Sequence, residues 1–257
     1  MATPSPRRAL RNQSRAQRVG LARALSKLGY CSRNQAWRLV EAGGVRVNGT
    51  ACRDPERPVA LARDRIEVDG EAVIAPPKIY LMLNKPRGLV TTASDEKGRE
   101  TVFRCLEGKE LPFVAPMGRL DKASEGLLLF TNDTAWAAEL SAPESHIDRT
   151  YHVQVDCLAD EALARRMTDG VNIDGDFLSA KSVRVLRHGT QNSWMEIVLD
   201  EGKNRHIRRL LAALGGNVLR LVRVAIGPLQ LGPLAKGELR QLTIEEVVSL
   251  AEPSGWS

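Results

Sequence analysis

Short stretches of apolar residues, some alternating with polar residues and some uninterrupted, recur along the chain from residue 79 onward. Such stretches predict strands near 79–83, 126–131, 150–156, 181–186, 194–199 and 218–225, with a further strand after residue 239. Helical spacing of apolar positions predicts helices near 134–141, 160–168 and 204–214. Several strands follow one another without a helix between them, which favours an α+β domain with a mixed, mostly antiparallel sheet.

A different pattern precedes this region. Apolar positions in residues 21–29 have helical spacing, and Ser32 with Gln35 forms the S-x-x-Q capping box that opens a second helix. The dipeptides Asn48-Gly49 and Asp69-Gly70 each follow a short alternating strand and are typical of tight turns. The sequence therefore predicts a small helix-helix-strand module over residues 19–74.

Changes in composition mark the boundaries between segments. Residues 1–18 are rich in Ser, Pro, Gln, Asn and Arg and predict a disordered basic arm. An organellar transit peptide is the second interpretation of this segment, disfavoured because it has no clear amphipathic stripe. The paired prolines of A75-P-P-K78 predict a linker at 75–78, which leaves a larger domain at 79–250 and a tail at 251–257.

Positive charge is distributed unevenly along the chain. The formal net charge is +6, yet residues 1–40 hold nine Lys or Arg and no acidic residue. A second stretch without acidic residues, 202–237, contains seven Lys or Arg. Either stretch alone is compatible with a solvated helix face, but two of them favour a nucleic-acid partner.

Several classes of protein have no support in the sequence. No apolar run approaches the roughly 18 residues of a membrane span, and the N-terminus lacks the apolar core of a secretory signal. Four dispersed cysteines and four histidines form no zinc-binding or H-E-x-x-H pattern. We therefore expect a cytoplasmic protein that uses neither a metal nor another cofactor.

Four motifs in the larger domain stand out by their order: N84-K-P-R-G88, G118-R-L-D121 with S124-E-G-L-L-L-F-T-N-D133, R149-T-Y151, and E201-G-K-N-R-H-I-R-R209. Together they resemble the motifs of pseudouridine synthases. Residues 21–70 look like the S4 (αL-like) RNA-binding domain. An S4 domain followed by these motifs is similar to the branch that modifies bacterial ribosomal RNA, and the resemblance covers roughly residues 20–245.

The resemblance implies a reaction and roles for four residues. Conversion of uridine to pseudouridine needs no redox change, and one ionised carboxylate can act as nucleophile or base; Asp121 would be that carboxylate. Arg208 would keep it charged through a bidentate contact. Arg119 would enter the space that the extracted uridine leaves, and Tyr151 would stack on the base. From the pattern alone, Tyr151 could equally be a core residue in line with Val153 and Val155.

Other basic residues are expected to contact RNA. Lys85, Lys203, Arg205 and Arg209 accompany the motifs of the larger domain, where a plain surface role is also open. On the two helices of the small module, the basic residues are Arg23, Lys27, Arg33 and Arg38. The expected partner is ribosomal RNA, with the large-subunit 23S RNA preferred over 16S, and the protein is expected to be a monomer.

Two other functions are compatible with parts of the sequence. A non-catalytic S4-type RNA-binding protein that acts in ribosome assembly would bind RNA in a salt-sensitive way and alter no nucleotide. It would, however, not need the motifs around Asp121, Tyr151 and Arg208 together. A glycosidase requires a second carboxylate, and Glu125, which falls in an apparent turn from Gly118 to Gly126, is given no catalytic role.

Overall fold

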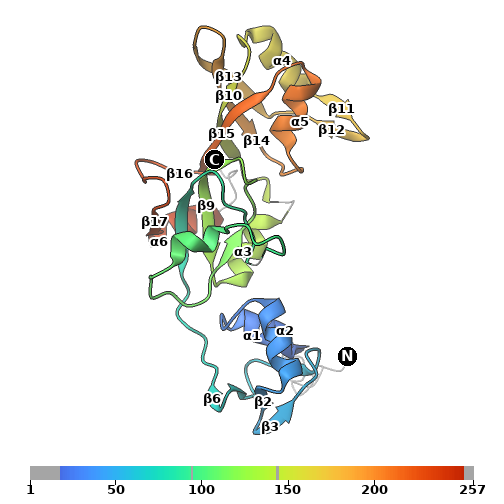
Figure 1. Cartoon of the computed structure of the whole chain (residues 1–257), viewed down its shortest axis with the longest axis vertical. Coiled ribbons are helices and arrows are strands. Elements are labelled where there is room, and N and C mark those ends of the chain that lie inside the picture. Colours follow the sequence, from blue (N-terminus) through green and yellow to red (C-terminus); the bar gives the residue numbers. More distant parts are fainter. Residues whose placement is uncertain (1–17, 94, 143–144, 252–257) are drawn as a thin grey trace, which may run out of the picture. The chain divides into compact units, whose positions relative to one another are not determined.

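The computed structural model describes residues 18–93, 95–142 and 145–251. The chain forms two compact units that divide between Pro77 and Lys78, within the predicted linker (Figure 1). Apart from Arg18 and Ala251, the predicted arm at 1–18 and the tail at 251–257 lie outside the described residues. None of the helices in the described ranges is long and apolar enough to cross a membrane.

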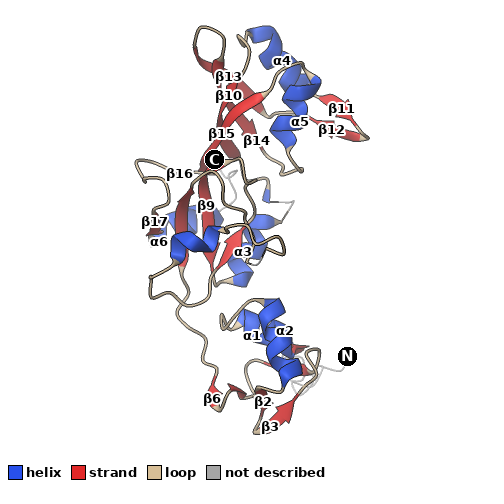
Figure 2. Ribbon diagram, in the orientation of Figure 1, coloured by secondary structure: helices blue, strands red, loops and turns tan. Residues whose placement is uncertain are grey.

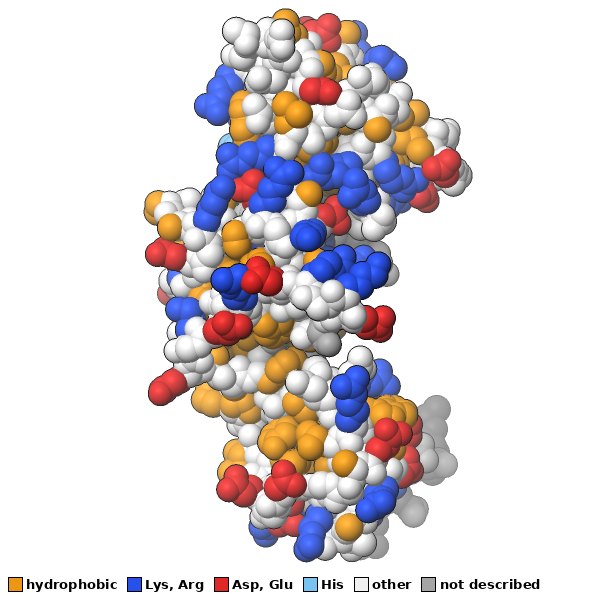
Figure 3. Space-filling model, in the orientation of Figure 1, with side chains coloured by type: hydrophobic (Ala, Val, Ile, Leu, Met, Phe, Trp, Pro, Cys, Tyr) orange, Lys and Arg blue, Asp and Glu red, His pale blue; other side chains and the backbone are white. Residues whose placement is uncertain are grey.

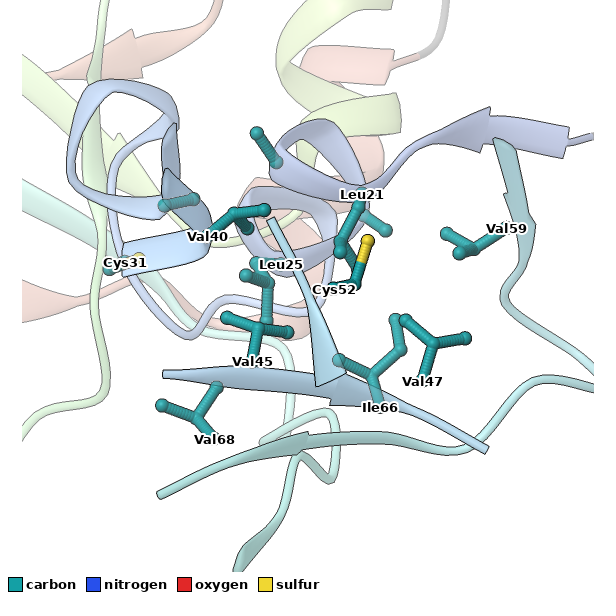
Figure 4. Close-up of a cluster of buried hydrophobic side chains, with 13 residues drawn as sticks. Leu21, Leu25, Cys31, Val40, Val45, Val47, Cys52, Val59, Ile66 and Val68 are labelled. Carbon is teal, nitrogen blue, oxygen red and sulfur yellow. The ribbon is translucent and has the colours of Figure 1, made fainter. Parts of the chain in front are cut away.

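The first unit is a small α+β module whose core lies between two helices and short strands (Figure 4). Leu21 and Leu25 from α1 pack with Val40 from α2 and with Val45 and Val68 from the strands. A four-stranded sheet has the order β3-β2-β5-β6, and β1 pairs with β4. Its elements are β1 (Arg18–Gly20), α1 (Leu21–Lys27), α2 (Arg33–Ala42), β2 (Val45–Val47), β3 (Thr50–Cys52), β4 (Pro58–Ala60), β5 (Ile66–Val68) and β6 (Glu71–Ala72).

Local signals in the sequence set these elements. The backbone amide of Gln35 donates to the Ser32 hydroxyl over 3.3 Å, and the Ser32 amide donates to the Gln35 side chain over 3.0 Å, which confirms the capping box. Asn48 and Gly49 both have positive φ, 53° and 79°, as a tight turn between β2 and β3 requires.

The second unit is built on one large sheet (Figure 2). Its main order is β13-β14-β10-β15-β9-β7-β17, in which only β15 and β9 pair in parallel. The predicted mixed, mostly antiparallel sheet is confirmed. The strands are β7 (Tyr80–Lys85), β8 (Ala115–Met117), β9 (Glu125–Thr131), β10 (Arg149–Val155), β11 (Val171–Ile173), β12 (Asp176–Leu178), β13 (Ser182–His188), β14 (Ser193–Leu199), β15 (Val218–Ile226), β16 (Leu229–Gln230) and β17 (Leu239–Gln241).

Helices cover this sheet in separate groups and create separate cores. The helices are η2 (Val102–Leu106, 3-10), α3 (Thr134–Ser141), α4 (Glu161–Asp169), α5 (His206–Ala213) and α6 (Ile244–Ala251). Side chains of α4 and α5 pack on β10, β14 and β15, whereas those of α3 and α6 pack on one face of β7 and β9. The η2 segment covers the other face of β7 and β9, so these two strands are buried on both sides.

The parallel pairing of β9 with β15 joins the two halves of the sheet. Gly126 is the register partner of Arg223 and has a φ of 102°. A methyl group at Gly126 would overlap the Arg223 carbonyl oxygen and lie 2.8 Å from the Arg223 amide nitrogen. Only glycine lets the two backbones approach this closely.

Candidate active site

A cavity of about 660 Å³ opens in the second unit where the turn before β9 meets β10, β15 and the start of α5. Figure 3 shows Lys and Arg side chains gathered in a band across the face of this unit. Four segments that lie far apart in the sequence line the cavity. Of the predicted site residues it brings together Arg119, Asp121, Tyr151, Lys203, Arg205 and Arg208.

Asp121 lies in the turn between β8 and β9, and hydrogen bonds fix its backbone. The Ser124 amide donates to the Asp121 carbonyl oxygen over 2.9 Å, and the Thr91 hydroxyl donates to the Leu120 carbonyl oxygen over 2.7 Å. The Asp121 side chain is 39% exposed, and its nearest ion-pair partner is Arg205 at 3.8 Å. A rigid backbone therefore presents an accessible carboxylate to the cavity.

The Lys85 side chain fixes the backbone of this turn through hydrogen bonds. Its side chain is completely buried, and its ammonium group donates to the carbonyl oxygens of Asp121 and Ser124 over 3.2 and 2.9 Å, and to that of Pro86 over 3.1 Å. The expectation that Lys85 contacts RNA phosphate is therefore wrong, because no solvent-facing part of the side chain remains. Burial lowers the Lys85 pKa from 10.5 to about 8, although nearby Cys105, Glu125 and Asp121 act in the opposite direction.

This buried cation makes stability depend on pH. Between pH 8 and 10.5 the unfolded chain binds more protons at Lys85 than the folded chain, so the free energy of unfolding rises with pH. Relative to Lys85→Met, the wild type should gain up to about 3 kcal/mol across this window and nothing below pH 8. Urea unfolding at pH 7 and 9.5 measures the difference. The exposed Lys109→Met serves as the matched control, and equal pH slopes for wild type and Lys85→Met would contradict the assignment.

Arg208 takes a different position from the one expected. Its guanidinium donates to the carbonyl oxygens of Val218 and Ala123, each over 3.3 Å, and not to the Asp121 carboxylate. Burial lowers its pKa, as does Arg205, and the charge of Asp121 raises it. In the described part of the chain, the predicted bidentate contact between Arg208 and Asp121 is absent. Arg205, expected only at phosphate, is the cation that pairs with Asp121.

Tyr151 and Arg119 contribute to the wall and rim of the cavity. Tyr151 on β10 shares a face with Val153 and Val155, but it is half-buried while both valines are completely buried. It therefore packs against the core with part of its ring and lines the cavity with the rest. Arg119 is exposed, two residues before Asp121.

Lys203 and Arg209, which were predicted to contact RNA, instead contact the hairpin of β11 and β12 within the protein. Lys203 pairs with Glu201 at 2.9 Å and donates to the Phe177 carbonyl oxygen over 2.7 Å. Arg209 pairs with Asp176 at 2.8 Å and does not line the cavity. Both side chains hold the hairpin of β11 and β12 against α5, so the expected phosphate contact of Arg209 has no support in this arrangement.

Two buried charged residues, on β9 and β15, were not predicted from the sequence. Glu125 is the first residue of β9, not part of a turn, and its buried carboxylate pairs with Arg220 at 2.9 Å and Lys236 at 2.7 Å. Arg223 on β15 is buried at the cavity. A signal for Arg223 was available, since it occupies the inward-facing position between buried Leu221 and Ala225.

The residues of the first unit that were predicted to contact RNA lie on its two helices. Arg23, Arg33 and Arg38 are exposed, and Lys27 is partly exposed. Arg33 pairs with Glu56 at 3.6 Å, and both side chains are largely exposed, so this ion pair contributes little to stability.

Comparison with known proteins agrees with this arrangement. Residues 79–213 match the family model for RNA pseudouridylate synthase, and residues 19–71 match that for the S4 domain. An uncharacterised RNA pseudouridine synthase of Rickettsia typhi is 39% identical over 225 residues, covering 87% of this chain and 91% of that protein. The ribosomal large subunit pseudouridine synthase B of Bacillus subtilis is 35% identical over 233 residues, covering 90% and 94%.

A solved structure shows the same fold. A crystal structure of a pseudouridylate synthase superposes with a TM-score of 0.64 at 26% identity, covering 90% of this chain and 99% of that one. The family model alone spans more than half of the chain. The chain therefore belongs to the RNA pseudouridylate synthase family and is an RNA pseudouridine synthase, an isomerase, with an S4 domain at its N-terminal side.

Proposed function

We propose that this synthase isomerises a specific uridine of ribosomal RNA, with the large-subunit 23S RNA as the preferred substrate and Asp121 as the catalytic carboxylate. The name of the Bacillus subtilis relative supports the choice of the large subunit. The role of Asp121 is supported by the structure of its turn. Buried Lys85 donates hydrogen bonds to the Asp121 and Ser124 carbonyl oxygens and so fixes the turn, while the Asp121 carboxylate faces the cavity.

The reaction explains why one carboxylate at a fixed position is enough. The bond from N1 of uracil to C1′ of ribose breaks, the base turns while it is held, and C5 joins the same C1′; the C5 proton leaves and N1 gains a proton. Atoms and electrons balance without an oxidant, a reductant or an added group. Asp121 serves this sequence as a nucleophile or as a base, and Arg205 places a positive charge 3.8 Å from its carboxylate.

In this proposal, Arg119 and Tyr151 stabilise the RNA after the uridine base has been extracted from it. Removing a uridine from folded RNA costs roughly a few kcal/mol. Exposed Arg119 would fill the vacated space, and the ring of Tyr151 would stack on the uracil, a contact worth about 1 to 3 kcal/mol. Lys203, partly exposed at the cavity, would meet phosphate if RNA displaces its contact with Glu201.

The S4 domain, residues 19–74 in this proposal, would supply affinity without chemistry. Replacing Arg23, Lys27 and Arg38 together by Gln should weaken binding of ribosomal RNA and reduce the slope of log affinity against log salt by roughly 2 to 3. Isomerisation at saturating RNA should not change. Filter binding at a series of salt concentrations measures the slope. A variant with Arg46, Arg53 and Arg63 replaced by Gln has the same net charge, and an equal loss of slope in both would contradict this assignment.

Pseudouridine mapping of both ribosomal RNAs tests the substrate. Cells lacking the gene should lose modification at a large-subunit uridine, and wild type should restore it while Asp121→Asn should not. Loss at a small-subunit uridine would reassign the RNA but keep the chemistry. Restoration by Asp121→Asn would refute the role of Asp121, and no change at any position would remove ribosomal RNA as the substrate.

A further inference from the structure

Arg223 occupies a junction between the proposed catalytic elements. On β15 it is the antiparallel register partner of Tyr151 on β10 and the parallel partner of Gly126 on β9. Its side chain is 4% exposed, and its Nε donates to the Leu127 carbonyl oxygen over 2.7 Å. One residue therefore touches both the strand that follows the Asp121 turn and the strand that carries Tyr151.

The charge of Arg223 is not compensated by an acid. Among the described residues no carboxylate lies within ion-pair distance of its guanidinium, and one terminal nitrogen, Nη2, has no hydrogen-bond partner. Burial lowers the pKa of Arg223, the neighbouring Tyr151 hydroxyl raises it, and nearby Arg149 lowers it further. A buried unpaired cation is costly to a fold, so its retention calls for a function.

Packing alone does not explain an arginine here. The flanking inward positions, Leu221 and Ala225, are apolar, and a methionine would fill a comparable space without a buried charge. A solvent-exposed contact with RNA phosphate does not account for it either, because Arg223 lines the cavity and is only 4% exposed. Arg223 lies opposite Tyr151 in the strand register and lines the same cavity, and the Tyr151 hydroxyl raises the pKa of Arg223.

We propose that Arg223 is a positioning residue, which holds the Tyr151 hydroxyl and with it the plane of the ring that faces the uracil. The proposal rests on the proposed role of Tyr151. Arg223 would then affect the turnover rate only by positioning the hydroxyl oxygen of Tyr151. Tyr151→Phe removes that oxygen and keeps the ring, so it removes the group through which Arg223 acts.

A double-mutant cycle on the full chain tests this. Tyr151→Phe and Arg223→Met should each lower kcat by about 10-fold to 100-fold, and the double variant should be within about threefold of the more affected single variant. RNA affinity should change little, since Arg223 is only 4% exposed. Arg223→Lys, which keeps the charge, should recover part of the activity. The melting temperature of Arg223→Met should not fall, because the substitution removes an unpaired buried charge.

Each other outcome has a definite meaning. Losses that multiply in the double variant, or full activity of Arg223→Met, would overturn the proposal. If Arg223→Met fails to fold, the same cycle is measured with Arg223→Lys, and multiplying losses decide against it again. Full activity of Tyr151→Phe with an inactive Asp121→Asn would refute the inference and leave the proposed function intact, whereas an active Asp121→Asn would refute the proposed function itself.

Discussion

Asp121→Asn is expected to lower the rate of pseudouridine formation by at least about 10⁴-fold, since it removes the only ionisable group of a side chain proposed to act directly on the uridine. RNA affinity should stay within about threefold of wild type, because the amide has nearly the same size and Asp121 is not a phosphate ligand. The fold should persist, since the side chain is 39% exposed and the turn is held through its backbone. Single-turnover assays with saturating enzyme measure the rate without interference from binding.

Asp169→Asn is the matched control for this experiment. Asp169 is the exposed last residue of α4 and does not line the cavity, so its change removes the same charge from the same unit. Its rate should equal that of wild type. Comparable rates for Asp121→Asn and wild type would remove Asp121 from the chemistry, and comparable losses in both variants would indicate an effect of net charge alone.

Gly126→Ala is expected to produce the largest loss of stability. The added methyl group would overlap the backbone of Arg223, and the residue would keep a φ of 102°, a conformation that residues with a Cβ atom rarely adopt. Neither backbone can withdraw without separating β9 from β15. The free energy of unfolding of the second unit should fall by at least about 3 kcal/mol, and its melting temperature by roughly 6 to 12 °C.

Gly175→Ala separates the clash from the backbone preference. Gly175 has a φ of 86°, and a methyl group there would meet no atom within 4 Å. Its substitution should cost about 1 to 2 kcal/mol, which is the cost of the left-handed conformation alone. Thermal unfolding monitored by circular dichroism compares the two variants. A loss in Gly126→Ala no larger than in Gly175→Ala would show that β9 and β15 tolerate a wider spacing.

Local patterns predicted the elements because each element carries its own signal. The capping box at Ser32 and the turn at Asn48 both depend on residues within three positions of one another. The resemblance supplied the residues of the cavity, since Asp121 and Tyr151 stand at fixed places in short motifs. These two kinds of information covered the fold class and most of the cavity wall.

The positions of long polar side chains could not be predicted in the same way. Lys85 ends a strand that is covered on both faces, and the strand's uninterrupted apolar residues do not reveal that the cover extends over the lysine. Glu125 and Arg220 are 95 residues apart and meet because β9 and β15 are parallel neighbours. Arg205, not Arg208, pairs with Asp121 because the chain turns at Arg205 with a φ of 49°, a geometry that no local pattern specifies.

The parallel pairing of β9 with β15 also determines when the enzyme can first work. One wall of the cavity comes from residues around Asp121, and another comes from residues 221–226. These two segments are joined by a long loop that closes when β9 pairs with β15. Because pairing of segments so distant in sequence is slow, we expect it to be a late step of folding. A growing polypeptide that has emerged only as far as α5 has the aspartate but no enclosed cavity. We therefore expect catalysis to begin only after β15 has been synthesised, when the S4 domain has already emerged.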